Sequence, residues 1–290
     1  MKTGNKIYQN SKFGLVKAIK QAYKIPEFLR ILPSLQHGWY PNPEDYFMYY
    51  LNDKNRQYYL TWNKENYNRA IVKSWKKAAV GCPYVSYRKL YKLHKSSYAV
   101  GTIFYPQHGT EKDFVDINYL SIIKELQSLP SSHQPVTVSL FYTDYLDDEI
   151  RGRYEKYFSV RTAGDPFSEN YMSNFYSTLH KHKYAIGNDV TTASLLAIES
   201  GIPFFLTKNT DFNYKGKKTK KVLLSSDQVK EIEKMKIFYD LFGNEPIKNI
   251  DNRLIKIVND ELGIGQQSHI LKIYLVILFS YLDKILNKSK

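Results

Sequence analysis

The chain has 290 residues, of which 43% are hydrophobic and 24% are charged, and its formal net charge is +14. This composition is typical of a globular protein, and the length allows one large domain or two modest ones, each with its own core. The single cysteine, Cys82, excludes a disulfide scaffold. No Cys and His residues stand at zinc-site spacing. The excess of positive charge favours an anionic partner, which is a nucleic acid, an anionic membrane face or a phosphorylated substrate.

Nucleic acid is the weakest of these three partners. The sequence holds no helix-turn-helix signature, no zinc finger and no aromatic RNA-binding motif. Its lysines are scattered, apart from the run YKGKKTKK from Tyr214 to Lys221, which we interpret as a solvated loop.

The first part of the chain predicts alternating helices and strands. Apolar residues at helical spacing predict a helix from Lys12 to Tyr23. An apolar segment then ends in the loop Gln36-His37-Gly38-Trp39, where glycine allows a close backbone approach to a ligand. The following predictions are a strand over Gln57 to Trp62, a helix over Lys64 to Lys77, a strand over Ala78 to Val85 and a basic linker over Tyr87 to Ser97.

The second part alternates more clearly, as a doubly wound parallel sheet requires. Ligands of such sheets bind outside the carboxyl ends of the strands. The predicted strands are Ala99 to Tyr105, Val136 to Tyr142, Ser159 to Ala163, Tyr184 to Gly187 and a short one after Pro203; the helices between them are Asn118 to Leu129, Asp147 to Phe158 and Ser168 to His182.

Helices dominate the C-terminal region. Two of them, Ser226 to Phe242 and Asp251 to Leu262, have charged outer faces. The last, His269 to Asn287, is apolar nearly all round, yet a bilayer span needs roughly 20 apolar residues. We therefore expect it to dock on the protein or to lie in a membrane interface. The predicted domains are 1–90 (acceptor side), 91–224 (nucleotide-sugar side) and 225–290 (helical).

The stretch from Tyr184 to Leu206 contains a candidate phosphate site. A strand leads through Asn188-Asp189 into a helix start rich in hydroxyls, and Gly201 with Pro203 ends the helix. Free backbone N–H groups and the positive end of the helix dipole meet at such a start. The alternative is that these polar residues only cap an ordinary helix.

Two Gln-His-Gly triplets stand at predicted strand ends. Their histidines, His37 and His108, suit a general base or a hydrogen-bond donor near neutral pH. Glu111 and Asp113 follow the second triplet and are candidates to orient His108 or to act as the base themselves. The alternatives are that each histidine bonds a neighbouring carbonyl and that the acids are exposed loop residues. Arg161 is a candidate to neutralise a diphosphate or an ordinary surface charge.

Three segments, LQHGWYP, FYPQHGT and TTASLLAIESGIP, resemble glycosyltransferases of the GT-B fold. The likeness is to bacterial enzymes of surface-polysaccharide synthesis, including teichoic-acid polymerases and capsule or lipopolysaccharide transferases. It implies an α/β fold with two Rossmann-like parallel-sheet domains facing a cleft, followed by C-terminal helices. It also implies an enzyme that needs no divalent metal or other cofactor, with His37 as base or acceptor contact and donor phosphates on the helix start.

One position departs from that family. Where many GT-B enzymes carry a Glu that bonds the donor ribose, this chain has Leu196, and Glu199 lies three residues further on. The nucleotide is therefore expected to be held differently, as in transferases that use CMP-sugars, although a UDP-sugar stays open.

The sequence thus predicts a glycosyltransferase that moves a sugar from a nucleotide-sugar to a growing surface glycan or lipid-linked acceptor at the cytoplasmic membrane face. A polyol-phosphate transferase, a sugar-nucleotide epimerase and a non-catalytic membrane- or nucleic-acid-binding protein are the alternatives. The predicted site comprises catalytic His37, His108, Glu111 and Asp113; donor-phosphate ligands Asn188, Thr191, Thr192, Ser194, Gly109 and Thr110; nucleotide contacts Gly187 and Arg161; and no metal.

Overall fold

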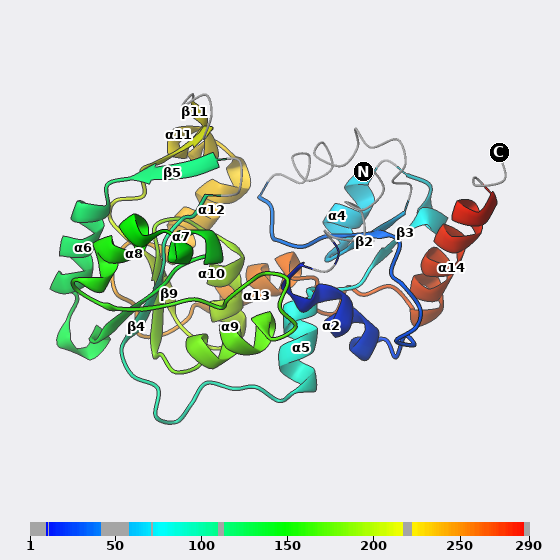
Figure 1. Cartoon of the computed structure of the whole chain (residues 1–290), viewed down its shortest axis with the longest axis horizontal. Coiled ribbons are helices and arrows are strands. Elements are labelled where there is room, and N and C mark those ends of the chain that lie inside the picture. Colours follow the sequence, from blue (N-terminus) through cyan, green and yellow to red (C-terminus); the bar gives the residue numbers. More distant parts are fainter. Residues whose placement is uncertain are drawn as a thin grey trace. The chain divides into compact units, whose positions relative to one another are not determined.

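The computed structural model describes residues 10, 12–41, 58–70, 72–109, 113–216 and 222–286. The chain forms a mixed α/β structure that divides into two compact units (Figure 1). Unit 1 consists of Met1–Leu93, Phe167–Glu169 and Lys256–Lys290. Unit 2 consists of His94–Pro166 and Asn170–Ile255. The end of the chain therefore returns to the unit that holds its beginning.

Unit 1 is built on a short parallel sheet with strand order β1-β2-β3. Its core includes Leu15, Ile19 and Trp62, whose side chains are buried. The strands are β1 (Ser34–Leu35), β2 (Tyr59–Thr61) and β3 (Lys77–Ala79), and the helices are η1 (Lys12–Gly14), α2 (Leu15–Ala22), α4 (Lys64–Arg69), η2 (Ser74–Lys76), α5 (Pro83–Leu90) and α14 (Ile270–Leu286).

Three predictions in this region were wrong. The helix expected from Lys64 to Lys77 stops at Arg69, because Ala70 adopts extended backbone angles. The expected linker from Tyr87 begins inside helix α5, which starts at Pro83. The strand expected over Ala78 to Val85 ends at Ala79, and Pro83 begins a helix instead. Proline fits the first turn of a helix, where its missing N–H has no partner to lose.

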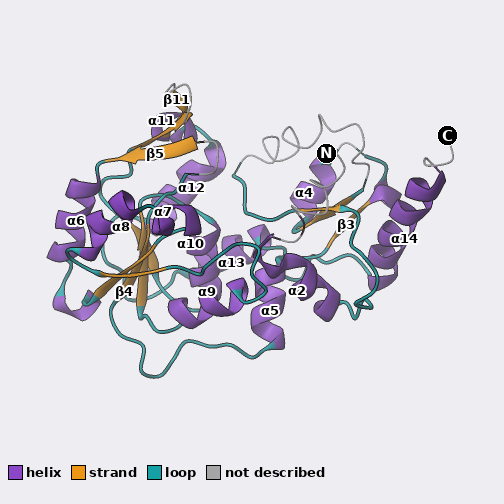
Figure 2. Ribbon diagram, in the orientation of Figure 1, coloured by secondary structure: helices purple, strands orange, loops and turns teal. Residues whose placement is uncertain are grey.

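Unit 2 contains a parallel sheet with strand order β7-β6-β4-β8-β9 (Figure 2). The predicted doubly wound α/β sheet is confirmed, and each expected strand lies within its predicted range. The strands are β4 (Thr102–Tyr105), β6 (Val136–Ser139), β7 (Ser159–Arg161), β8 (Tyr184–Gly187) and β9 (Phe204–Leu206), and the helices are α6 (Tyr119–Ser128), η3 (Ser131–His133), α7 (Tyr142–Leu146), α8 (Asp148–Glu155), α9 (Tyr171–Leu179) and α10 (Thr192–Glu199).

Helices cover both faces of this sheet. Phe104 of β4 packs with Leu126 of α6 and Tyr154 of α8 in one apolar cluster. The neighbouring residue Tyr105 points to the other face, as strand geometry requires, and its ring lies 6.0 Å from that of Phe175 in α9. Figure 2 shows α6 and α9 on opposite sides of the strands.

A second, antiparallel sheet in unit 2 has the order β11-β10-β5. It consists of β5 (Asp113–Ile117), β10 (Phe212–Gly216) and β11 (Val222–Ser225). The sequence did not predict β5. The loop predicted from Tyr214 to Lys221 was wrong in its first residues, which belong to β10, and residues 217–221 lie outside the described part.

The helices after residue 225 divide between the units. The helix predicted over Ser226 to Phe242 is broken into α11 (Ser226–Lys230) and α12 (Glu233–Phe242), while α13 (Asn252–Glu261) contains the boundary between units. Helix α14 packs against β3 and η2, which confirms that it docks on the protein. None of the described helices combines the length and apolar character needed to cross a bilayer.

Candidate functional site

The main sheet of unit 2 has a topological switch point between β4 and β8. From β4 the chain winds outward through β6 to β7, and then returns to β8 on the other side of β4 and continues to β9. Ligands of open α/β sheets bind outside the carboxyl ends of the strands at such a point. The residues that follow β4 and β8 are the Gln107-His108-Gly109 triplet and Asn188-Asp189, so two predicted motifs meet there.

Two short hydrogen bonds join these motifs. The backbone N–H of Gln107 donates to Oδ1 of Asn188 over 2.6 Å, and Nε2 of Gln107 donates to Oδ2 of Asp189 over 2.7 Å. Asn188 is fully buried, and no bond to its Nδ2 is found within the described residues. The second triplet, Gln107-His108-Gly109, is therefore linked by hydrogen bonds to the residues that lead into α10.

Asp189 is an acid of this site whose pKa is clearly shifted. Its Oδ1 accepts from the hydroxyl of Tyr239 and from the N–H of Val190, each over 2.7 Å. Burial raises the pKa of the Asp189 carboxyl to about 6, against the opposing effect of these donors. Burial and the neighbouring Asp189 also raise the pKa of Tyr239. Through these hydrogen bonds Asp189 connects the loop after β4, the loop after β8 and helix α12.

The start of α10 is a capping box formed by Thr191 and Ser194. The Ser194 hydroxyl accepts from the N–H of Thr191 over 2.9 Å, donates to its carbonyl over 2.6 Å and is fully buried. Thr191 and Thr192 are half-buried. A cap satisfies only part of the first-turn donors, so backbone N–H groups and the dipole still make this end attractive to an anion.

His108 lies over the carboxyl end of β6. Its ring stacks on Phe141 with centroids 4.1 Å apart, and its Nδ1 lies 2.8 Å from the carbonyl oxygen of Gly109. A carbonyl can only accept, so Nδ1 carries the hydrogen and Nε2 is the nitrogen that takes up a proton.

Close packing of neighbouring atoms favours glycine at two positions of this site. A Cβ on Gly109 would lie 2.6 Å from the carbonyl oxygen of Asp113 and 2.8 Å from Cα of Phe114. A Cβ on Gly187 would lie 2.9 Å from the ring of Phe204. The contact of Gly109 with the start of β5 also places the backbone of Asp113 beside the triplet. Neither position has room for a larger residue unless its neighbours move.

His37 belongs to unit 1, where its loop follows β1. The buried amide of Gln36 fixes this loop: Oε1 accepts from the N–H of Trp62 over 2.8 Å, and Nε2 donates to the carbonyl of Gly38 over 2.9 Å. Nδ1 of His37 faces the carbonyl of Leu35 at 3.2 Å. Its tautomer is therefore the same as that of His108, with Nε2 as the basic nitrogen.

The remaining predicted residues are less closely tied to this cluster. Arg161 is exposed at the end of β7, and β6 separates that strand from β4. Thr110 and Glu111 lie outside the described residues. Gln107, Asp189 and Tyr239 were not predicted as site residues from the sequence. The repeated glutamine of the triplets was the available signal for Gln107, whereas nothing local marks Tyr239, which is 50 residues from its partner.

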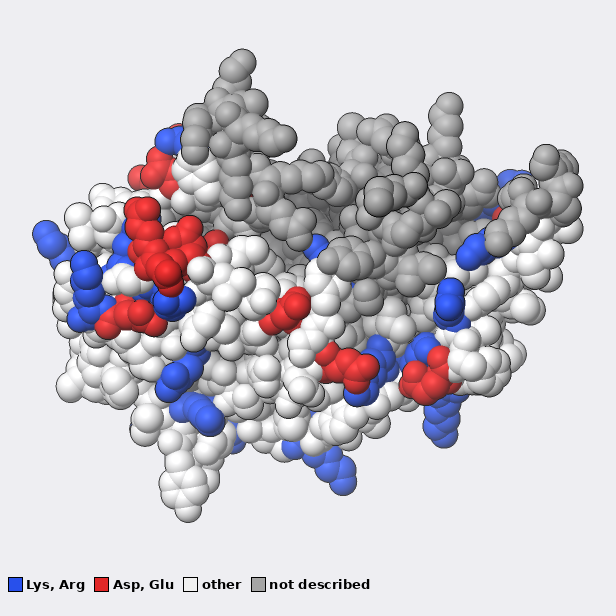
Figure 3. All heavy atoms as spheres, viewed as in Figure 1, with Lys and Arg blue, Asp and Glu red and all other residues white. Residues whose placement is uncertain are grey.

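Charges on the visible face of the molecule are mixed. On the face drawn in Figure 3, the lysines and arginines are dispersed, and acidic side chains gather around α8. Asp147 caps that helix by accepting from the N–H groups of Glu149 and Ile150, so these acids belong to the start of α8. Within the described part of the chain, no three His, Cys, Asp or Glu residues are placed to hold a metal ion.

Unit 2 therefore belongs to the class of doubly wound α/β units with polar loops at a switch point. No protein-family profile and no curated protein sequence matches the chain. Among solved structures it matches the wall teichoic acid polymerase TagF, determined with CDPG, at 12% identity and a TM-score of 0.32. The match covers 75% of this chain and 60% of the polymerase chain. Because similarity at this level is low, the fold class rests on the strand order described above.

Proposed function

We propose that the protein is a glycosyltransferase of the GT-B type that uses a nucleotide-sugar donor and no divalent metal. The observation that carries the proposal is the meeting of the Gln107-His108-Gly109 triplet with Asn188-Asp189 and the start of α10 at the switch point of unit 2. The resemblance of these segments to surface-polysaccharide transferases gives the reaction class.

In the proposed reaction, an acceptor hydroxyl attacks the anomeric carbon of the donor, and the bond from that carbon to the phosphate oxygen breaks. His37 takes the proton of the hydroxyl at Nε2. His108, Thr191, Thr192 and the N–H groups of the first turn of α10 stabilise the departing phosphate, with Ser194 holding the turn in shape. We place this activity at the cytoplasmic face of a membrane, on a glycan or lipid-linked acceptor.

The test is a thermal-shift screen against uridine, cytidine and guanosine nucleotides. A ligand at about 100 times its Kd stabilises the folded state by about 2.7 kcal/mol. We expect one nucleotide class to raise the melting temperature of the wild type, and His108→Ala to reduce that rise. The matched control is His94→Ala, since His94 is an exposed histidine of the same unit. Equal nucleotide shifts in both variants, or none in the wild type, would remove the switch-point site from the proposal.

The transfer step needs a separate measurement. His37→Ala should reduce sugar transfer by about a hundredfold or more, as expected for loss of a general base, while its nucleotide shift stays unchanged. Analysis of the products formed from the active donor then distinguishes glycosyl transfer from polyol-phosphate transfer or epimerisation.

A further inference from the structure

Helix α14 has two apolar faces, and only one of them is covered. Ile273, Val276, Ile277 and Ser280 are buried on the side that packs against β3 and η2. The opposite side carries an exposed stripe whose members are 43% to 65% accessible. This α14 stripe consists of Leu271, Leu275, Leu278, Leu282, Ile285 and Leu286. A helix that packs on a protein core normally exposes polar residues to solvent. We therefore expect this exposed apolar face to contact a partner.

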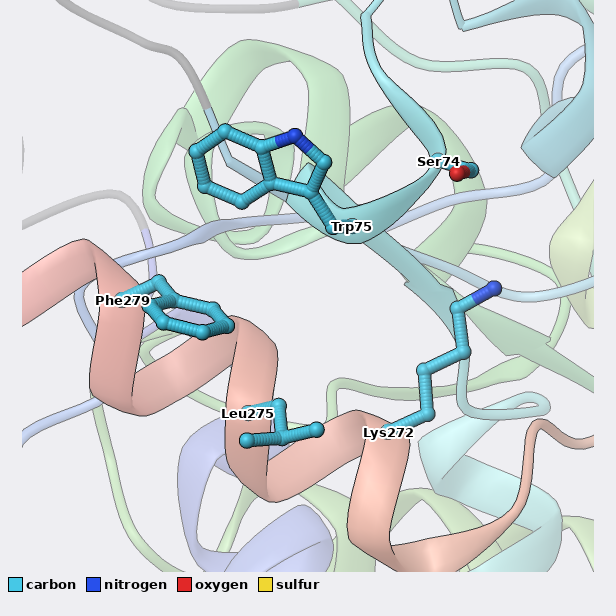
Figure 4. Close-up of a pocket in the computed structure, with 5 residues that line it drawn as sticks. All are labelled: Ser74, Trp75, Lys272, Leu275 and Phe279. Carbon is cyan, nitrogen blue, oxygen red and sulfur yellow. The ribbon is translucent and has the colours of Figure 1, made fainter.

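One edge of the α14 stripe borders an aromatic hollow of about 220 Å³. Figure 4 shows the ring of Trp75 and that of Phe279 on the same hollow, with Leu275 beside them. Trp75 is 41% exposed. The hydroxyl of Tyr67 lies 2.6 Å from the ammonium group of Lys272, which holds that cation on the protein. This edge is therefore apolar and aromatic, with a partly exposed tryptophan of the kind enriched at membrane interfaces.

The C-terminal end of the stripe borders a hollow of different chemistry, with a volume of about 380 Å³. Two cations, Arg30 and Lys284, line it together with Phe28, whose side chain is 87% exposed. Neither cation has a carboxylate partner among the described residues. The Tyr281 hydroxyl donates to the carbonyl of Arg30 over 2.7 Å and ties this segment to α14. The lining residues are Phe28, Arg30, Leu32, Tyr281, Lys284 and Ile285.

The nearest carboxylate on α14 does not neutralise this cationic hollow. Asp283 accepts from the hydroxyl of Tyr58 over 2.7 Å and lies 3.6 Å from the ammonium of Lys76. It is thus engaged with the residue that precedes β2 and with η2. Two cations that lack a carboxylate partner within the described residues, next to exposed apolar side chains, match the chemistry of an anionic lipid, whose phosphate and acyl chains are adjacent.

We propose that the α14 stripe and Phe28 dock onto an anionic phospholipid bilayer, with α14 lying along the surface and Arg30 and Lys284 on a headgroup phosphate. This inference rests on the membrane location in the proposed function and assigns it to a surface. A second copy of the chain fits less well, because each copy carries a net charge of +14 and self-association brings like charges together.

The test is co-sedimentation with vesicles of equal parts phosphatidylglycerol and phosphatidylcholine, compared with phosphatidylcholine alone. The wild type should bind the anionic vesicles. Arg30→Gln with Lys284→Gln should weaken binding roughly 30-fold, at about one kcal/mol per cation near the surface. The matched control is Lys181→Gln with Lys183→Gln, which removes the same charge from exposed positions in unit 2 and should have less than a threefold effect.

A second matched pair of variants tests the apolar part of the proposed membrane-binding surface. Leu278→Ser should reduce vesicle binding several-fold, whereas Leu120→Ser on α6 should not, although the two leucines are 52% and 54% exposed. Binding that is insensitive to Leu278→Ser, or lost equally in the lysine control, overturns the proposal in favour of general adsorption of a basic protein. A wild-type dimer that Leu278→Ser converts to a monomer, without vesicle binding, assigns the stripe to a second copy. Nucleotide-induced thermal shifts measured on the same variants report separately on the donor site.

Discussion

At the scale of single residues, Asp189 links the architecture of the site to pH. Its folded pKa is raised to about 6, from an ordinary value of 3.8. The folded state therefore binds a proton more tightly than the unfolded state does. The stabilising contribution of the protonated carboxyl is fully present below pH 3.8 and is lost as the pH rises to about 6 and beyond.

Replacing Asp189 with Asn should remove this dependence. From pH 4 to pH 7, the free energy of unfolding of the wild type should fall relative to that of Asp189→Asn by about 2 kcal/mol, since one pKa unit corresponds to about 1.36 kcal/mol and part of the effect lies below pH 4. The measurement is urea denaturation of both proteins at several pH values in this window. The Gln107 amide can turn to present its oxygen to the new Asn, so the variant keeps its link to the β4 loop. Parallel stability curves would show that Asp189 does not titrate in this window.

At the scale of elements, the start of α10 has two tasks that substitutions can separate. Ser194 is buried and, among the described residues, its hydroxyl bonds only within the capping box, whereas Thr192 is half-buried in the first turn. Ser194→Ala should therefore lower the free energy of unfolding by about 1 kcal/mol, the usual value of a lost cap. It should leave nucleotide affinity unchanged when binding is measured well below the melting temperature.

Thr192→Val provides the contrast, because it keeps the shape of the side chain and removes the hydroxyl. We expect it to reduce nucleotide affinity about tenfold, as the loss of a hydrogen bond to a charged group does. Isothermal titration with the nucleotide identified by the screen measures both variants. If Ser194→Ala weakens binding more than Thr192→Val does, the assignment of a purely structural cap to Ser194 is wrong.

Elements whose signals are local were predictable from the sequence. Helix α10 ends before Gly201, whose φ is 73°, as the Gly and Pro pattern predicts. Strands β4, β6, β7, β8 and β9 have buried apolar residues between clear helices. By contrast, β5 is stabilised by β10, which lies almost a hundred residues further along, and its sequence DFVDI has no clear alternation of burial. Pairing with β10 determines that this segment is a strand, and no local sequence pattern indicates that pairing.

The residues of the site likewise divide into those that local sequence patterns predicted and those that they did not. The carboxyl-end loops that hold His108 and Asn188 were predictable, because strand order in α/β sheets places such loops at one edge. The central role of Asp189 was not, because it depends on Tyr239 from α12 and on the depth of burial. The uncovered face of α14 was similarly ambiguous, since its sequence is apolar all round and only packing shows which half is buried.

At the scale of the whole molecule, the last segment of the chain is part of the core of unit 1. Leu262, Ile273, Val276 and Ile277 are fully buried. Burial of one such side chain contributes about 1.5–3 kcal/mol, and a folded domain is stable by only about 5–15 kcal/mol in total. Glu261 also accepts a hydrogen bond of 2.7 Å from the indole of Trp39. Unit 1 should therefore not fold without residues 256–290.

Truncation after Ile255 tests this interdependence with a built-in reporter. All three tryptophans of the chain, Trp39, Trp62 and Trp75, belong to unit 1, so their fluorescence follows that unit alone. In the fragment 1–255 the emission should shift to the red, towards that of the urea-unfolded chain, because Trp39 and Trp62 are buried in the intact protein. The segments of unit 2 are complete in this fragment, and its nucleotide-induced thermal shift should persist. Unchanged emission would mean that unit 1 folds without α14, and loss of both signals would mean that the two units fold as one.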